Sequence, residues 1–328
     1  MTSRWELTGS YRYFRSHRHF VGTDEQENRA EEESEVINTV HQAAVSVKYT
    51  FNDRWSLTGI VPYFNADRSS PIRNDAREVI ARTVTHAEGI GDVSFIGRWY
   101  VLDPATHPHG NLWLGPGIKF PTGDSSVQDR RDKFDTATQT IIDAGVSNVD
   151  QSIQPGDGGL GAILDFGGYL ASQRGAATFY GSIFYLFNPE ETDHVETGRS
   201  RPSEKYMSIG DQYLVRVGGA FGGPSWNGWT VGIGGRWEGM PARDAFGGSD
   251  WFRRPGYTVS AEPWVAWSRG TNSVSVALPV ALHRERIKSV PDFKDDRHGD
   301  AAFADWSLQV SYSHRFPSKA ATKQHHPE

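Results

Sequence analysis

Trp306-Ser307-Leu308-Gln309-Val310-Ser311-Tyr312-Ser313-His314-Arg315-Phe316 is the last patterned segment of the chain. Large or apolar residues occupy nearly every second position, small or charged residues lie between them, and the segment ends on an aromatic residue. Because successive side chains of a β-strand point to opposite faces, this alternation predicts a strand with one apolar face and one polar face.

The same pattern recurs along the whole sequence, for example from Ala43 to Phe51 and from Trp229 to Trp237. About twelve such segments can be counted, and period-two alternation repeated in this way is typical of transmembrane β-barrels. Within lipid a sheet must close, because an open edge would leave backbone donors and acceptors unsatisfied. We therefore predict an all-β fold: one closed antiparallel transmembrane barrel of about twelve strands over residues 1–316, followed by a disordered tail over residues 317–328.

The composition agrees with a barrel and excludes several other classes. The chain has 328 residues, of which 37% are hydrophobic and 23% charged, and no run of about 20 apolar residues that could form a transmembrane helix. Its 35 Gly, 11 Trp, 12 Tyr and 17 Phe suit close-packed strands with aromatic belts at the membrane interfaces. It has no Cys, which excludes disulfides and thiolate metal sites, and a net charge of only -6, which argues against a nucleic-acid partner.

The predicted connections are alternately short and long. Short turns are expected near residues 52–54, 104–110 and 172–175, and long polar loops near 64–91 and 122–159. Both chain ends fall on the short-turn side, the arrangement of bacterial barrels with periplasmic turns and extracellular loops. The segment from Thr122 to Gly159 is long enough to fold inward as a constriction, and we expect a short helix within it, from about Thr136 to Ala144.

Four prolines lie inside predicted strands, where each removes one hydrogen bond of the ladder. We expect Pro62, Pro116, Pro263 and Pro279 to mark bulges or strand ends.

Charged residues in phase with the polar faces predict the lining of the lumen. An Arg or Lys on the lipid face would cost about 2–4 kcal/mol near mid-membrane, so these residues are expected to point inward. They either form a structural ladder of ion pairs, as Arg216, Arg236 and Glu262 would, or a polar conduit that attracts solutes of negative or partial negative charge. The predicted pore-lining residues are Lys48, Arg98, Lys119, Asp165, Arg216, Arg236, Glu238, Glu262, His283 and Arg315, with Arg12 and Glu285 in the same phase.

The chain shows no export signal, because Met1 to Arg4 lead directly into the first strand. We expect a processed protein of the bacterial outer membrane, with the lipid bilayer, small organic solutes and the barrel-assembly machinery as its partners. No cofactor or metal is expected.

Three alternatives to a channel stay open at this point. A structural or adhesin-type barrel would have the same strands without a transport function. An outer-membrane hydrolase would need a Ser/His pair, and His314 lies near Ser311 and Ser313, although the alternation places those serines on the opposite face. A soluble β-protein is the third alternative. We expect a channel and no enzymatic activity.

Three short motifs resemble those of a known group of outer-membrane proteins. Gly89-Ile90-Gly91-Asp92 begins one strand, Lys119-Phe120-Pro121-Thr122-Gly123-Asp124 ends the next, and Pro155-Gly156-Asp157-Gly158-Gly159 precedes a third. In this order the chain resembles the phenol-degradation meta-pathway transporter family, directly over residues 89–170 and elsewhere by pattern. The resemblance implies a passive, cofactor-free channel for small, often aromatic, organic compounds.

Overall fold

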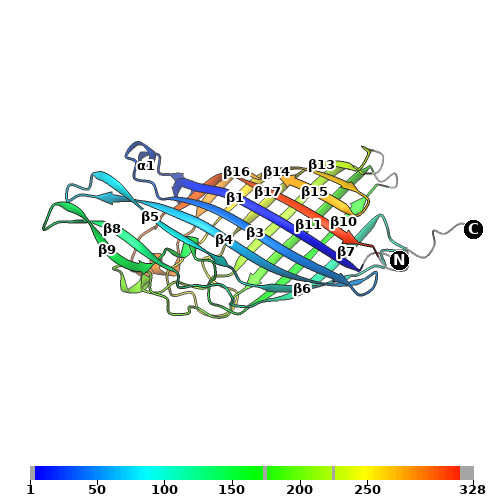
Figure 1. Ribbon diagram of the computed structural model, residues 1–328, viewed down its shortest axis with the longest axis horizontal. Coiled ribbons are helices and arrows are strands. Elements are labelled where there is room, and N and C mark those ends of the chain that lie inside the picture. Colours follow the sequence, from blue (N-terminus) through cyan, green and yellow to red (C-terminus); the bar gives the residue numbers. More distant parts are fainter. Residues whose placement is uncertain (1–3, 173–175, 224–225, 318–328) are drawn as a thin grey trace, which may run out of the picture.

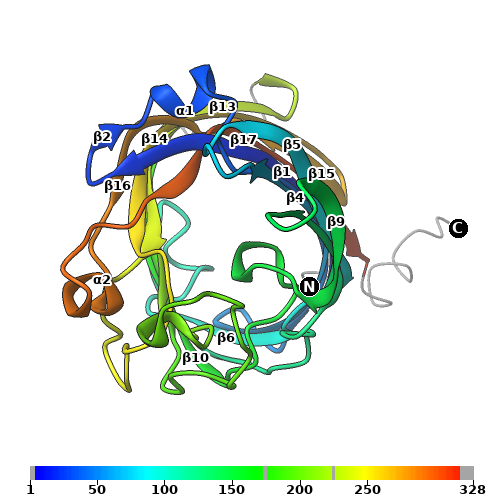
Figure 2. The same cartoon turned by 90° about the vertical axis from the view of Figure 1, so that its left-hand side faces the viewer.

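The computed structural model describes residues 4–172, 176–223 and 226–317, and its main sheet closes on itself. The first strand, β1 (Trp5–Val21), pairs with the last, β17 (Ala301–Phe316), from Trp5↔Phe316 to Phe20↔Ala301. The protein is thus a closed transmembrane barrel of twelve antiparallel strands, seen end-on in Figure 2.

Ten of the twelve positions in the wall are continuous strands. Besides β1 and β17, these are β3 (Ile37–Thr50), β4 (Trp55–Arg73), β7 (Gly110–Lys119), β10 (Gly161–Ala171), β11 (Ala177–Phe187), β12 (Gln212–Gly222), β13 (Trp229–Met240) and β14 (Gly256–Arg269). The other two positions are each split into two pieces, β5 (Val79–Ile90) with β6 (Ser94–Tyr100) against β4, and β15 (Asn272–Ala277) with β16 (Val280–Arg286) against β14.

The breaks in the wall coincide with the four prolines. Pro62 of β4 faces the gap between β5 and β6, and Pro263 of β14 faces the gap between β15 and β16, which contains Pro279. Pro116 lies opposite an interruption in the β6–β7 ladder, between the pairs Ile96↔Gly117 and Trp99↔Leu114. Each proline therefore lies where a ladder hydrogen bond is already missing.

β1 begins and β17 ends at one end of the barrel, the terminus rim, while most of the irregular structure lies at the other end, the loop rim (Figure 1). The short elements are β2 (Asp24–Glu25), α1 (Asn28–Glu31), β8 (Gln128–Asp135), β9 (Thr140–Asn148), η1 (Gln151–Ile153), η2 (Pro202–Glu204) and α2 (Val290–Lys294). No helix among the described residues is long and apolar enough to cross a membrane.

Two expectations about the connections were wrong. The predicted polar loop over residues 64–91 is a hairpin, because β4 and β5 continue their pairing as far as Arg73↔Val79. The predicted helix from Thr136 to Ala144 is instead the tip of the β8–β9 hairpin. β-branched Thr140, Ile141 and Ile142 favour a strand there. The expected tail at 317–328 lies, from residue 318 on, outside the described residues.

The outer face of the barrel is apolar. Val45, Val217 and Ile233 are 53%, 64% and 63% exposed, respectively, as expected of side chains in contact with lipid. Aromatic rings gather toward both rims: Trp5 packs on Tyr49 near the terminus rim, with ring centroids 4.6 Å apart, and Tyr213 packs on Trp237 toward the loop rim, with centroids 5.2 Å apart. In a membrane barrel the hydrophobic band lies in the hydrocarbon region and the two aromatic belts lie at the membrane–water interfaces.

We predict that Val217→Arg destabilises the folded barrel by about 2–4 kcal/mol, because it places a charge on the lipid face in the middle of β12. Denaturant unfolding of the protein in lipid vesicles measures this effect. Val84→Arg is the matched control, since Val84 is similarly exposed, at 57%, but lies in β5 toward the loop rim. Equal losses for the two variants would contradict the placement of the lipid-facing band.

Candidate functional site

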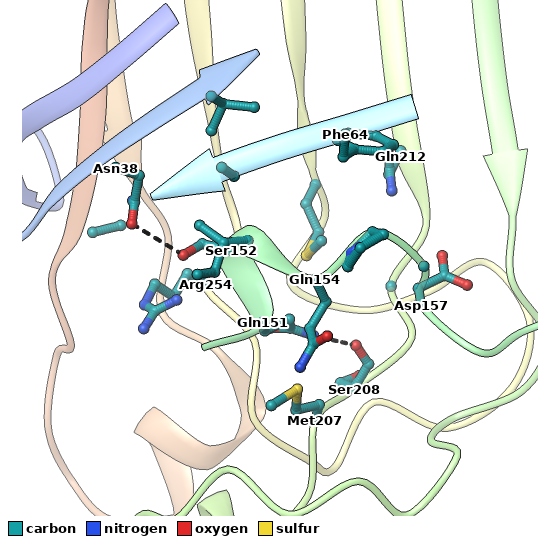
Figure 3. A pocket seen from close by; sticks show the side chains of 18 of the residues that line it. Asn38, Phe64, Gln151, Ser152, Gln154, Asp157, Met207, Ser208, Gln212 and Arg254 are labelled. Carbon is teal, nitrogen blue, oxygen red and sulfur yellow. Dashed lines mark hydrogen bonds between the residues drawn. The ribbon is translucent and has the colours of Figure 1, made fainter. Parts of the chain in front are cut away.

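The lumen contains two main cavities in series. The loop-side cavity, of about 790 Å³, lies among Phe64, Asp157, Met207 and Arg254 and is seen in Figure 3. The central cavity, of about 590 Å³, is bounded by Tyr180, Arg216 and Trp264 among other residues. Each is large enough for one small organic molecule.

The segment that follows β9 folds into the barrel and lines the loop-side cavity. It is visible inside the ring in Figure 2, and η1 brings Ser152 within reach of Asn38 (Figure 3). Asp150 accepts two hydrogen bonds from Arg254, at 2.8 and 2.7 Å, and lies 3.4 Å from Arg68. Burial alone would raise the pKa of Asp150, but these two guanidinium groups hold it well below its usual range. Asp150 therefore stays ionised and anchors the segment.

The three motifs of the family resemblance meet at one joint. Asp92 accepts hydrogen bonds from Lys119 Nζ, at 3.3 Å, and from the backbone amides of Gly123 and Asp157. Lys119 also pairs with the Asp157 carboxylate. The backbones approach so closely that a Cβ on Gly123 would lie 2.8 Å from the Cα of Gly156.

This joint changes the interpretation of Lys119, which the sequence placed in the pore lining. Lys119 does border the loop-side cavity, but it is only 6% exposed and its charge is matched by two carboxylates. The contacts give it a structural part, because it holds together the broken strand β5–β6, β7 and the inward-folded segment. The sequence analysis missed Asp92 and Asp157 as its partners, although both lie in the quoted motifs.

A network of ion pairs spans the lumen between the cavities. Glu238 on β13 lies 2.6 Å from Arg236 and 3.1 Å from Arg12 on β1, and three positions of the wall separate these two strands. Arg236 and Arg216 both pair with Glu262, at 3.1 and 3.4 Å. Arg12 lines both main cavities and a third space of about 310 Å³. We call these five residues the ionic bridge.

Four more of the predicted residues lie on the inner face, away from the bridge. Arg98 pairs with Asp165 at 2.6 Å. At the terminus rim Lys48 and Arg315 share Glu6, at 3.6 and 2.8 Å. These pairs neutralise much of the charge that the sequence assigned to the lumen.

His283 and Glu285 were wrongly placed on the inner face. The β14–β16 ladder passes from Val259↔His283 directly to Ser260↔Ala281, so a bulge after Pro279 reverses the alternation. His283 packs on the ring of Tyr257 on the outer face, with ring centroids 5.7 Å apart, and Glu285 accepts a hydrogen bond from the Tyr257 hydroxyl.

The residues that turn inward in their place are Arg284 and Arg286, which are 8% and 2% exposed. In the sequence, Pro279 was the residue that indicated a nearby break in the alternation.

The candidate hydrolase residues do not form a Ser/His pair. His314 is hydrogen-bonded to Asn272, Ser313 to Thr8 and Ser311 to Ser275. Among the described residues no group of three or more His, Asp or Glu side chains is arranged to hold a metal ion.

Comparisons with known proteins identify the fold. No protein-family model and no curated protein matches the sequence. Among solved structures, an outer membrane channel from Pseudomonas putida F1 matches with a TM-score of 0.61 and 12% identity, covering 96% of each chain.

Two other solved structures match less closely, each over 96% of this chain. One is the toluene transporter TodX of P. putida, with a TM-score of 0.50, 9% sequence identity and 91% of its own chain covered. The other is the β-domain of the Bordetella autotransporter BrkA, with a TM-score of 0.50, 13% sequence identity and 100% of its own chain covered. At these identities the likeness concerns the fold alone: the chain folds as an outer-membrane β-barrel does.

Proposed function

We propose that the protein is an outer-membrane channel through which small organic solutes diffuse passively. The observation that carries this proposal is the pair of molecule-sized cavities along one lumen, both of which are bordered by Arg12 of the ionic bridge. A conduit of this kind needs no cofactor and no chemical step. The name of the P. putida F1 neighbour, an outer membrane channel, points the same way.

Aromatic compounds are the class of solute that the lining favours. Tyr180 and Trp264 face the central cavity, with Trp264 Nε1 donating to the Tyr180 hydroxyl at 2.9 Å, and Phe64 and Phe252 line the loop-side cavity. Such rings stack on an aromatic solute and orient it without strong binding. One of the solved structures with a similar fold is a toluene transporter, which agrees with an aromatic solute.

Reconstitution in planar bilayers tests the channel directly. We expect discrete conductance steps from the wild-type protein, and a lower preference for anions in Arg216→Ala because it removes a cation that borders the central cavity. Arg15→Ala, on the outward side of β1, is the control. A purified barrel that inserts but never conducts would favour a structural or adhesin-type barrel instead.

The start of β1 and the end of β17 lie at the rim with the short turns, so we place that rim in the periplasm and the loop rim outside the cell. The lipid bilayer and the barrel-assembly machinery are the partners that such a protein requires. A lipase or esterase assay on the same preparation is expected to be negative, since no Ser/His pair forms around His314.

A further inference from the structure

Cationic side chains outnumber carboxylates in the lining of the loop-side cavity. Eight Arg and Lys side chains line it, against four Asp and no Glu. Further carboxylates lie behind the lining, but they are shared: Asp150 pairs with both Arg254 and Arg68, and Glu204 with Arg297 and Arg199. Arg286 and Arg12 are matched by Asp292 and Glu238, so the weakly compensated cations are those that share Asp150 or Glu204.

Among the cations that line the loop-side cavity, Arg199 has the charge that is least compensated by a carboxylate. Its nearest carboxylate is Glu204, at 3.6 Å, and Glu204 already accepts a hydrogen bond from Arg297. Among the described residues the Arg199 guanidinium donates no hydrogen bond, and its side chain is one-third exposed. A group with five donors in a planar fork is thus open toward the cavity.

Phe252 holds this charge in place. The Arg199 guanidinium lies 3.9 Å from the centre of the Phe252 ring, and that of Arg254 lies 4.8 Å from the same ring. Burial lowers the pKa of Arg199, and the neighbouring charge of Arg254 lowers it further. Two guanidinium groups at one buried ring repel each other, so an anion between them and the cavity would be favourable.

The rest of the lining is suited to the organic part of a solute. Phe14, Phe64 and Phe184, each partly exposed, present apolar surface to the same space. An inorganic anion would leave this surface in water, whereas a neutral hydrocarbon would leave the guanidinium without a partner.

From these contacts we infer that the channel selects small organic carboxylates, whose carboxylate pairs with Arg199 while the apolar body packs on the partly exposed phenylalanines of the same cavity. The inference rests on the proposed channel and narrows its solute class. Arg suits this task because its planar fork matches a carboxylate in a bidentate way.

Binding of benzoate and of benzyl alcohol to the purified full-length protein, measured by calorimetry in detergent, tests the inference. The two compounds have similar shapes and differ in charge. We expect benzoate to bind more tightly than benzyl alcohol, and Arg199→Gln to weaken benzoate roughly ten- to hundredfold while leaving benzyl alcohol unchanged, since a hydrogen bond to a charged group is lost. Arg199→Lys, which keeps the charge, should restore part of the affinity.

Arg243→Gln is the matched control, because Arg243 is exposed in the loop between β13 and β14. Equal affinities of the two compounds for the wild type, or an unchanged benzoate affinity in Arg199→Gln, would overturn the inference. Conductance recorded on the same preparations separates the two proposals: a conducting protein without benzoate preference refutes only the solute class, and benzoate binding by a protein that does not conduct refutes only the channel.

Discussion

Arg12→Ala should raise the single-channel conductance of the reconstituted protein severalfold. Arg12 is the only member of the ionic bridge that belongs to β1, and its contact with Glu238 joins β1 to β13 through the lumen. Arg12 borders both the loop-side and the central cavity, so the loss of its side chain should widen the passage between them. Glu238 keeps its 2.6 Å contact with Arg236, so the variant leaves no carboxylate without a partner.

The control for this prediction lies on the same strand. Arg15→Ala removes the same side chain from the outer face of β1 and should conduct as the wild type does. Glu238→Gln should reproduce part of the increase, because it weakens the bridge from the β13 side. Wild-type conductance in Arg12→Ala would mean that the ionic bridge is not the narrowest point of the lumen. The inward-folded segment around η1 would then be the candidate constriction.

Arg253→Ala should cost about 3–5 kcal/mol in the stability of the loops that surround the loop-side cavity. Arg253 is fully buried, and its guanidinium makes hydrogen bonds of 2.6 and 2.5 Å to Asp244 and of 3.0 Å to Ser208. Removing one partner of a buried pair leaves the other charge without compensation, which is the costly case. Arg253 and Asp244 both lie in the loop after β13, and the hydrogen bond from Arg253 to Ser208 joins this loop to the loop after β11.

Hydrogen exchange measures this loss. Amides of residues 188–211 and 241–255 should lose protection by a factor corresponding to that energy, while those of the barrel strands keep theirs. Arg243→Ala, an exposed arginine of the same loop, should leave exchange unchanged. Unchanged protection in Arg253→Ala would show that the loops are held by other contacts.

Alternation by itself determined the barrel, the twelve strands and the inner or outer side of most residues, because the two faces of each strand meet solvents as different as lipid and water. It determined Arg216, Arg236, Glu238 and Glu262 as inward-facing residues, and the prolines marked where the ladder breaks.

What the tertiary structure decided is which inward charges meet. Arg12 and Glu238 are 226 positions apart and come together only through closure of the barrel. The bulge that turned His283 outward depends on how β16 pairs with β14, and one inserted residue is enough to reverse a period of two. The excess charge of Arg199 likewise arises from loops that meet over the lumen, where no repeating pattern constrains the sequence.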